Sequence, residues 1–320
     1  IHKNKDEIAR SFHEKIPNTS YTEDVEELTA IARATLRRKF FEAQVGLSGI
    51  NFAIAETGTL LLVENEGNGR MCTTVPPVHI AVMGLEKVIE KLTDVPPLLQ
   101  LLTGSATGQM VTTYVNMITS PRKADEKDGP KEVHLIILDN GRSRILADRQ
   151  LRETLLCIRC GTCLNHCPVY IRIGGHAYGF VYPGPIGKIL TPQMAGLRSA
   201  GDLATASSLC GACGEVCPVK IPIPDLIRRL RNDAYGNTAG SAVKDAGTKK
   251  CSVERAVWKG WALVNRAPAL NAANVKMLAK ARGKLPNQGP LAAWTRVRCQ
   301  PRFAPRSLHD IAREKGVDNE

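Results

Sequence analysis

Apolar residues recur at a helical period in the first 46 residues of the chain. A helix is predicted to follow the acidic stretch after Thr22, because a hydroxyl group followed by acidic residues suits a helix N-cap. One face of this helix would carry Val25, Leu28, Ile31 and Leu36. Segment 1–46 is therefore expected to be helical.

The pattern changes to short apolar runs between residues 50 and 83. Three strands are predicted: 50–56, which alternates, 59–63, which is continuously apolar, and 78–83. Between the last two, the glycines and asparagines of residues 65–70 favour a hairpin turn, and the alternative is an anion held by backbone N–H groups. A helix is expected over residues 85–92.

A further pair of strands is predicted around residue 140. Residues 134–138 and 143–146 are apolar and flank Asn140 and Gly141, a dipeptide that strongly indicates a hairpin. Together with the preceding elements, this pair predicts an α/β domain over residues 1–148.

Seven of the ten cysteines fall between residues 157 and 217. The first four form a C-x2-C-x2-C-x3-C-P motif, and the last three repeat this pattern without its first cysteine. In two-cluster ferredoxins such spacing wraps three thiolates around one cubane and directs the fourth to the other cubane. Segment 149–234 is therefore predicted to be an α-helical domain that binds two [4Fe–4S] clusters and carries electrons.

The crossed arrangement divides the cysteines unequally between the two clusters. The first cluster would take Cys157, Cys160, Cys163 and Cys217. The second would take Cys167, Cys210 and Cys213, and Ser207 stands where its fourth cysteine is missing. A serine oxygen, a water molecule, a substrate or the distant Cys251 could complete the second site, or it could hold a three-iron cluster.

Zinc and disulfides fit this spacing less well. A structural zinc site favours four tetrahedral ligands in two C-x2-C pairs, and three cysteines within seven residues are too close for ordinary disulfides. Cys72, Cys251 and Cys299 stand alone and are expected to be small buried residues. The clustered cysteines indicate a metal-binding protein, which we expect in the reducing cytoplasm.

Charge gathers at the C-terminal end of the chain. The net charge is +12, and residues 241–320 hold 16 Lys and Arg residues against 6 Asp and Glu residues. We interpret residues 235–320 as a basic extension with a helix around Trp258 and another over 272–281. No nucleic-acid-binding signature accompanies the charge, so a partner subunit is the expected contact and nucleic acid is not. No apolar run is long enough for a transmembrane helix, although peripheral contact with an anionic membrane stays an alternative.

The whole chain resembles the lactate-utilisation protein B family, the iron–sulfur subunit of the three-component L-lactate oxidation system. The N-terminal likeness lies in segments 52–59, 73–80, 105–109 and 138–144. The cysteine motifs at 157–168 and 207–221 match the family's two-cluster ferredoxin part, and residues 285–295 resemble its C-terminal extension.

The resemblance carries expectations about fold and function. It implies an isomerase- or CoA-transferase-like lactate-utilisation domain, N-terminally incomplete because family members have further sequence before Ile1. It also implies that a serine at the start of the second motif is a family trait. The implied role is relay of electrons between other lactate-utilisation subunits (a cysteine-rich iron–sulfur subunit and a second subunit with a lactate-utilisation domain) as L-lactate is oxidised to pyruvate. A catalytic subunit that binds substrate at the open iron, or a cluster-based redox sensor, are the alternatives.

Three features outside the cysteines are further candidates. Glu56 lies between two predicted strands, where it could contact a ligand or cap nearby amides. His79 lies in an apolar run and is expected to be a hydrogen-bonded core residue. The aromatic stretch 176–185 could pack against the clusters or dock an electron-transfer partner.

Overall fold

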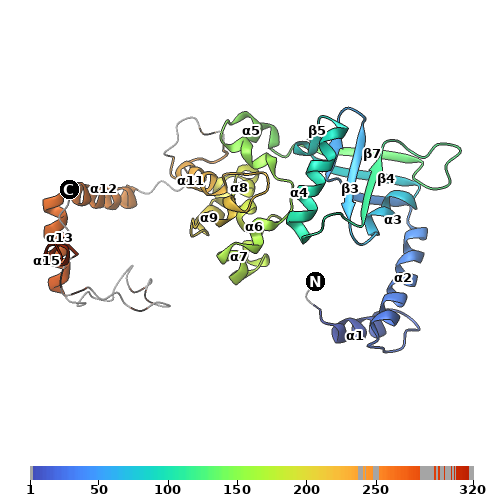
Figure 1. Cartoon of the computed structure of the whole chain (residues 1–320), viewed down its shortest axis with the longest axis horizontal. Helices are drawn as coiled ribbons and strands as arrows, with labels where there is room; N and C mark the ends of the chain where they lie inside the picture. The colour runs from blue at the N-terminus through green and yellow to red at the C-terminus, as the bar shows by residue number, and fades with distance from the viewer. Residues whose placement is uncertain are drawn as a thin grey trace. The chain divides into compact units, whose positions relative to one another are not determined.

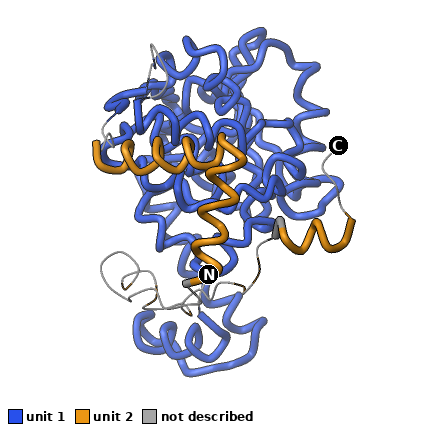
Figure 2. Tube along the Cα trace, turned by 90° about the vertical axis from the view of Figure 1, so that its left-hand side faces the viewer, with its two compact units in different colours: residues 1–248 blue, residues 249–320 orange. Residues whose placement is uncertain are grey.

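A computed structural model describes residues 3–236, 241, 243–247 and 252–281, together with residues 292, 295, 299, 304, 306 and 308–316. The chain divides into two units, residues 1–248 and 249–320 (Figure 2). The first unit has an α/β region followed by a helical region that holds the cysteine motifs. The predicted order of fold classes along the chain is therefore present.

Two helices begin the first unit, as predicted for residues 1–46. Helix α1 (Lys5–Lys15) starts with a capping box between Asn4 and Glu7, and α2 (Val25–Glu42) follows it. The prediction that Thr22 caps α2 is wrong. Asp24 is the N-cap, and its carboxylate accepts the N–H of Glu27 at 2.9 Å.

Among the residues that the structure describes, seven strands form two sheets beside these helices (Figure 1). One sheet is parallel and has the order β1 (Val45–Gly49), β4 (Val78–Gly84), β7 (Glu132–Leu138). The other is mixed and has the order β5 (Val88–Ile89), β2 (Phe52–Ile54), β3 (Thr59–Glu64), β6 (Tyr114–Ile118). The strands predicted at 59–63, 78–83 and 134–138 are confirmed, and the strand predicted at 50–56 is shorter than expected.

The hairpin predicted at Asn140 and Gly141 is wrong. The chain does reverse there, with Gly141 at φ +84°, but it enters helix α5 (Arg142–Ala147). The Asp139 carboxylate accepts the N–H of Ser143 at 2.7 Å and so stabilises the first turn of that helix. The Asn-Gly signal identified a turn correctly and misassigned the element that follows it.

Two further local predictions are also wrong. Residues 65–70 do not form a hairpin turn, because α3 (Asn68–Thr74) begins there and the Glu64 carboxylate accepts the N–H groups of Gly69 and Arg70. The helix expected at 85–92 is replaced by the 3₁₀ turn η1 (Leu85–Lys87), strand β5 and the 3₁₀ turn η2 (Leu92–Asp94). Helix α4 (Val95–Thr107) then starts with prolines in its first turn, where their missing N–H groups are not needed.

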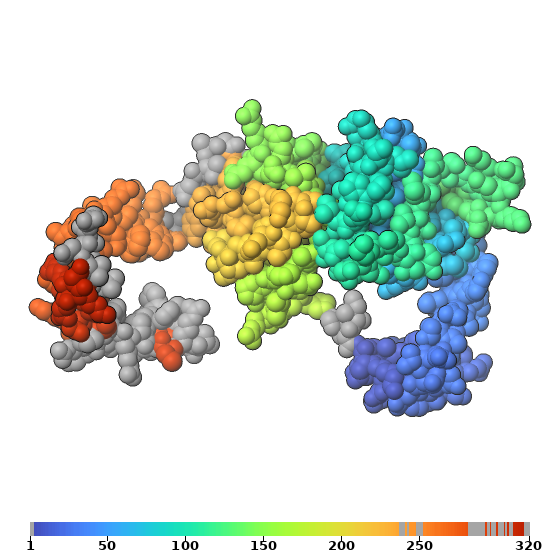
Figure 3. All heavy atoms as spheres, viewed as in Figure 1, coloured from blue at the N-terminus to red at the C-terminus, as the bar shows by residue number. Residues whose placement is uncertain are grey.

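The helical region packs around α8 (Gly184–Ala195) and α11 (Ile223–Ala234). Its core includes Ile189, Leu190, Leu226, Ile227 and Leu230, all of them almost completely buried. The remaining elements are η3 (Leu151–Leu156), α6 (Thr162–Asn165), α7 (Pro168–Ile173), η4 (His176–Tyr178), α9 (Leu197–Thr205) and α10 (Ala212–Glu215). Helix α4 lies between the sheets and this region, and the space-filling view shows the two regions in contact (Figures 1 and 3).

The second unit contains α12 (Ser252–Arg266), α13 (Pro268–Ala281) and α15 (Leu308–Glu314) among its described residues. The two helices predicted in the basic extension correspond to α12 and α13. Trp258 and Trp261 contact edge to face at 5.8 Å and are both exposed. Among the described residues, no helix has the length and apolar character needed to cross a membrane.

Candidate iron–sulfur site

Both cysteine motifs bend the backbone in the same unusual way. Cys160 lies between Arg159 at φ +65° and Gly161 at φ +79°, and Cys210 lies between Leu209 at φ +56° and Gly211 at φ +90°. Left-handed conformations are uncommon for residues other than glycine, so their recurrence marks two equivalent turns. The equivalence places Ser207 at the position that Cys157 has in the first motif.

The first cavity has a volume of about 160 Å³ and four cysteines in its lining. Cys157, Cys160 and Cys163 come from the first motif, and Cys217 is the last cysteine of the second motif. The rest of the wall is mainly apolar and includes Ile158, Leu164 and Ile186. Cys217 of the second motif therefore lies beside three cysteines of the first motif, the placement that the predicted cross-over requires.

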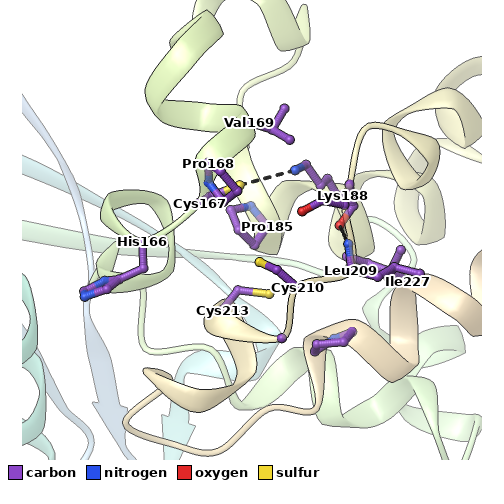
Figure 4. A pocket seen from close by; sticks show the side chains of 14 residues that line it. His166, Cys167, Pro168, Val169, Pro185, Lys188, Leu209, Cys210, Cys213 and Ile227 are labelled. Carbon is purple, nitrogen blue, oxygen red and sulfur yellow. Dashed lines mark hydrogen bonds between the residues drawn. The ribbon is translucent and has the colours of Figure 1, made fainter. Parts of the chain in front are cut away.

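The second cavity is much smaller, about 10 Å³, and three cysteines line it. Cys210 and Cys213 belong to the second motif and Cys167 to the first, so the cross-over is reciprocal (Figure 4). The other polar residues of the lining are Ser207, Ser208, Lys188 and His166, and the His166 ring is directed away from the cysteines (Figure 4). Cys210 is exposed, whereas Cys167 is buried, so the second cavity is open at the Cys210 edge.

Hydrogen-bond donors reach sulfur in both cavities. In the first cavity, the backbone N–H of Ile221 donates to Cys217 Sγ at 3.4 Å. The Lys188 ammonium group donates to Cys167 Sγ at 3.6 Å. Such donors stabilise negative charge on sulfur and are the usual surroundings of cluster thiolates.

Burial opposes ionisation of the inner thiols. It raises the pKa of Cys163 to about 12 and raises the pKa values of Cys157 and Cys213. The backbone N–H of Ala212 and the Ser208 hydroxyl instead lower the pKa of exposed Cys210. Several buried thiolates in one cavity therefore need the positive charge of a metal centre.

The size of the first cavity fits a group larger than one ion. Zinc binds thiolates at about 2.3 Å, so four cysteines around one zinc ion converge closely. Among the described residues, no three His, Cys, Asp or Glu side chains form a group that could hold a single metal ion. The four thiols instead surround about 160 Å³, which suits a cubane. The second cavity, about 10 Å³, does not meet this volume criterion, so its assignment rests on its three cysteines alone.

A charged network beside the first cavity was not expected from the sequence. The Glu86 carboxylate accepts hydrogen bonds from Arg142 Nε and, at 3.3 Å, from Arg159 Nη2. The neighbouring Lys87 donates to the carbonyl oxygen of Cys157 at 3.2 Å, and the Arg159 guanidinium lies 4.4 Å from the Tyr182 ring centroid. The partners of Glu86 and Lys87 are more than 50 residues away in sequence, so no local pattern could indicate them.

The other predicted candidates lie away from both cavities. Glu56 accepts the N–H of Leu92 at 2.9 Å, the amide-capping role that was the alternative to ligand contact. His79 is completely buried and hydrogen-bonded to Ser48 at 2.7 Å, as expected for a core histidine. Cys72 lines neither cavity.

The two other isolated cysteines and the aromatic stretch 176–185 are the remaining candidates. Cys299, in the second unit, is exposed, contrary to the expectation that it is buried. Cys251 falls outside the described residues. In the aromatic stretch, Tyr182 lines the first cavity and Tyr178 is buried, which agrees with packing around the site.

Comparison with protein families gives the class to which this architecture belongs. Residues 1–138 match the LUD domain, residues 153–221 match a 4Fe-4S dicluster domain, and residues 229–317 match "Lactate utilisation protein B, C-terminal". The chain is therefore an iron–sulfur protein with an N-terminal α/β LUD domain, and the predicted fold class is confirmed.

Curated relatives identify the family within this class. Lactate utilization protein B of Bacillus licheniformis is 43% identical over 99% of this chain and 67% of its own length. The Bacillus subtilis protein of the same name is 42% identical, as is the Escherichia coli "Uncharacterized electron transport protein YkgF", each over 94% of this chain and 62% of the relative. The chain belongs to the lactate utilization protein B family, and it spans about two thirds of the length of these relatives.

Proposed function

We propose that the two cavities hold two [4Fe–4S] clusters. Cys157, Cys160, Cys163 and Cys217 would bind the first, and Cys167, Cys210 and Cys213 would bind the second. The observation that carries this proposal is the reciprocal cross-over, because each cavity combines one motif with the last cysteine of the other. When bound, the clusters supply one-electron transfer.

The fourth ligand of the second cluster is the open point of this assignment. Ser207 Oγ already accepts the N–H of Leu209 at 3.2 Å, and it lines the second cavity. A serine oxygen, a water molecule or a substrate could complete the site, or a three-iron cluster could occupy it. Cys251, which lies outside the described residues, stays a further possible ligand.

We further propose that the chain is the electron-transfer subunit of a system that oxidises L-lactate to pyruvate in the cytoplasm. The names of its relatives, lactate utilization protein B and electron transport protein, support this role. The other lactate-utilisation subunits would be its electron donor and acceptor. The chain's own residues would hold the clusters, surround the first with apolar side chains that exclude water, and donate hydrogen bonds to sulfur.

Anaerobic purification with iron and sulfide analysis tests the cluster assignment. Two cubanes give about eight irons per chain, and a three-iron second cluster gives about seven. Paramagnetic resonance of the reduced protein separates these cases, and no lactate turnover is expected without partner subunits. A colourless protein that contains zinc would refute the proposal.

Substrate binding at the second cluster is a second candidate function. The exposed position of Cys210 and the lack of a fourth thiol among the residues lining the second cavity favour it. It predicts that lactate or pyruvate alone changes the resonance spectrum of that cluster. An unchanged spectrum at saturating substrate would leave electron transfer as the function.

A further inference from the structure

Lys188 is a buried lysine that points into the second cavity. It lies on α8, it is only 1% exposed, and it is among the largest fully buried side chains of the chain. Figure 4 shows its side chain directed at Cys167, with the sulfur atoms of Cys210 and Cys213 on the other side of the cavity. Burial of an ammonium group is unfavourable unless an anion compensates its charge.

The surroundings of Lys188 contain no carboxylate partner among the residues that the structure describes. Its ammonium group donates to Cys167 Sγ at 3.6 Å and lies 5.5 Å from the centroid of the Tyr178 ring. The face of an aromatic ring attracts a cation but does not neutralise it. The remaining source of negative charge at this position is the set of thiolates that line the cavity.

We propose that Lys188 is the counter-ion of the second cluster, which it anchors through Cys167 and whose reduction potential it raises. The proposal rests on the clusters proposed above. Reduction adds one negative charge to a cluster, so a fixed cation at sulfur favours the reduced form. Lys188 is thus a positioning residue that acts through Cys167.

The first cluster has no equivalent contact among the described residues. Lys87 is also buried there, but it donates to the carbonyl oxygen of Cys157 and not to sulfur. Arg159 pairs with Glu86. The sulfur of Cys217 accepts only a neutral backbone N–H, from Ile221. The effect of Lys188 should therefore fall on one cluster of the two.

The test is a potentiometric titration followed by paramagnetic resonance on the anaerobic 320-residue chain. Lys188→Met removes the charge and keeps a similar length, and Lys188→Arg keeps the charge. We expect Lys188→Met to lower the reduction equilibrium constant of one cluster at least tenfold, which corresponds to a fall of about 59 mV in its reduction potential. The reduction potential of the other cluster should not change. Lys188→Arg should stay close to the wild type. A Cys210→Ala variant identifies the affected cluster, since it removes a ligand of the second cluster only.

Lys220→Met is the matched control. Lys220 lies three residues after Cys217, and its side chain is exposed, so solvent screens its charge. In Lys220→Met the reduction equilibrium constant of each cluster should therefore stay within about twofold of the wild-type value. Loss of the second cluster in Lys188→Met but not in Lys188→Arg would also support the counter-ion role.

Two results would overturn the inference without touching the proposed function. One is unchanged potentials in a Lys188→Met protein that retains both clusters. The other is equal loss of the second cluster in Lys188→Met and Lys188→Arg while the chain stays folded, because that would show a purely steric role. By contrast, a wild-type protein without iron would refute the proposed function itself.

Discussion

Replacing Glu86 by glutamine tests the charged network that joins the α/β region to the first cysteine motif. Glu86 lies on η1, and its side chain is 3% exposed. It pairs with Arg142, which is 5% exposed, and with Arg159, which is 23% exposed. The Glu86→Gln substitution keeps the shape of the side chain and removes its charge, which leaves two guanidinium groups near each other without a carboxylate.

The expected cost is about 3 kcal/mol. Removal of one partner of a buried ion pair costs about 3–5 kcal/mol. The lower end applies because Arg142 keeps a hydrogen bond to the Asp139 carbonyl oxygen at 3.1 Å and Arg159 keeps its contact with the Tyr182 ring. A cost of about 3 kcal/mol corresponds to roughly a hundredfold change in an opening equilibrium.

The same network predicts the pH dependence of this cost. Burial opposes ionisation of Glu86, but a backbone N–H and the two arginines outweigh it, so its pKa lies below the ordinary value. The stabilisation is therefore complete above the ordinary carboxyl pKa and is lost as the pH falls through the lowered value in the folded protein. The difference between Glu86→Gln and the wild type should shrink below about pH 4.

Hydrogen–deuterium exchange measures the local effect directly. Amides in segments 84–92 and 156–166 should exchange roughly a hundredfold faster in Glu86→Gln at pH 7. Glu90→Gln is the control, since Glu90 has an 82% exposed side chain in an ion pair with Lys91 and should change exchange by less than about threefold. Equal exchange in the two variants would show that the network does not hold the cysteine motif.

Three further tests, two of them with a control variant, extend these experiments. Gly187→Ala should destabilise the chain by about 1–3 kcal/mol in urea unfolding, since an added Cβ would overlap a backbone carbonyl oxygen. Gly104→Ala is the control: its added Cβ meets nothing within 4 Å, so it should stabilise α4 by about 0.5–1 kcal/mol. If Gly104→Ala destabilised the chain more than Gly187→Ala does, the result would contradict the packing of α8. The double substitution of Cys157 and Cys160 by alanine should lower the iron content by about four per chain, because it leaves the first cavity with two thiols. Cys72→Ala should not change the iron content, and equal losses in the two proteins would refute the ligand assignment. Asp148→Asn should cost about 1–2 kcal/mol at pH 7 in the same unfolding assay. This cost should decrease below the ordinary carboxyl pKa and disappear as the pH falls through the lowered pKa of the folded protein. Burial opposes ionisation of Asp148, but two backbone N–H groups and a guanidinium hold its pKa below the ordinary value, and a cost that persists in acid would disprove this.

The predictions succeeded where the signal is local and periodic. The first two helices, the strand at 59–64 and the strand at 78–84 follow from patterns within single elements. The cysteine spacing also carries long-range information, since the motif itself specifies which cysteine crosses to the other cavity. The placement of Cys167 and Cys217 beside cysteines of the other motif thus follows from the spacing, and their assignment as cluster ligands stays a prediction.

The failures lie where a distant contact decides the local structure. Asn140 and Gly141 turn the chain as expected, but burial of Ile145 in the core of the cysteine region favours a helix over a second strand. Lys188 follows closely on an aromatic stretch, and nothing in its neighbours indicates burial. Its contact with Cys167 depends on how α8 packs against the first motif. The division of the chain into domains at residues 148 and 234 stays a prediction.

The first cavity lies where two hydrophobic cores meet. Ile158, between the first two cysteines, packs in the core formed by β2, β3 and α4, whereas Cys157 and Cys163 pack against the core of α8 and α11. Val219 contacts both cores. The Thr162 hydroxyl adds a hydrogen bond to the Ser105 carbonyl oxygen at the end of α4, at 2.6 Å. The same short segment supplies thiols to the cavity and side chains to both cores. We therefore expect a cluster bound in this cavity to stabilise the docking of the α/β region, and the docking to stabilise the bound cluster.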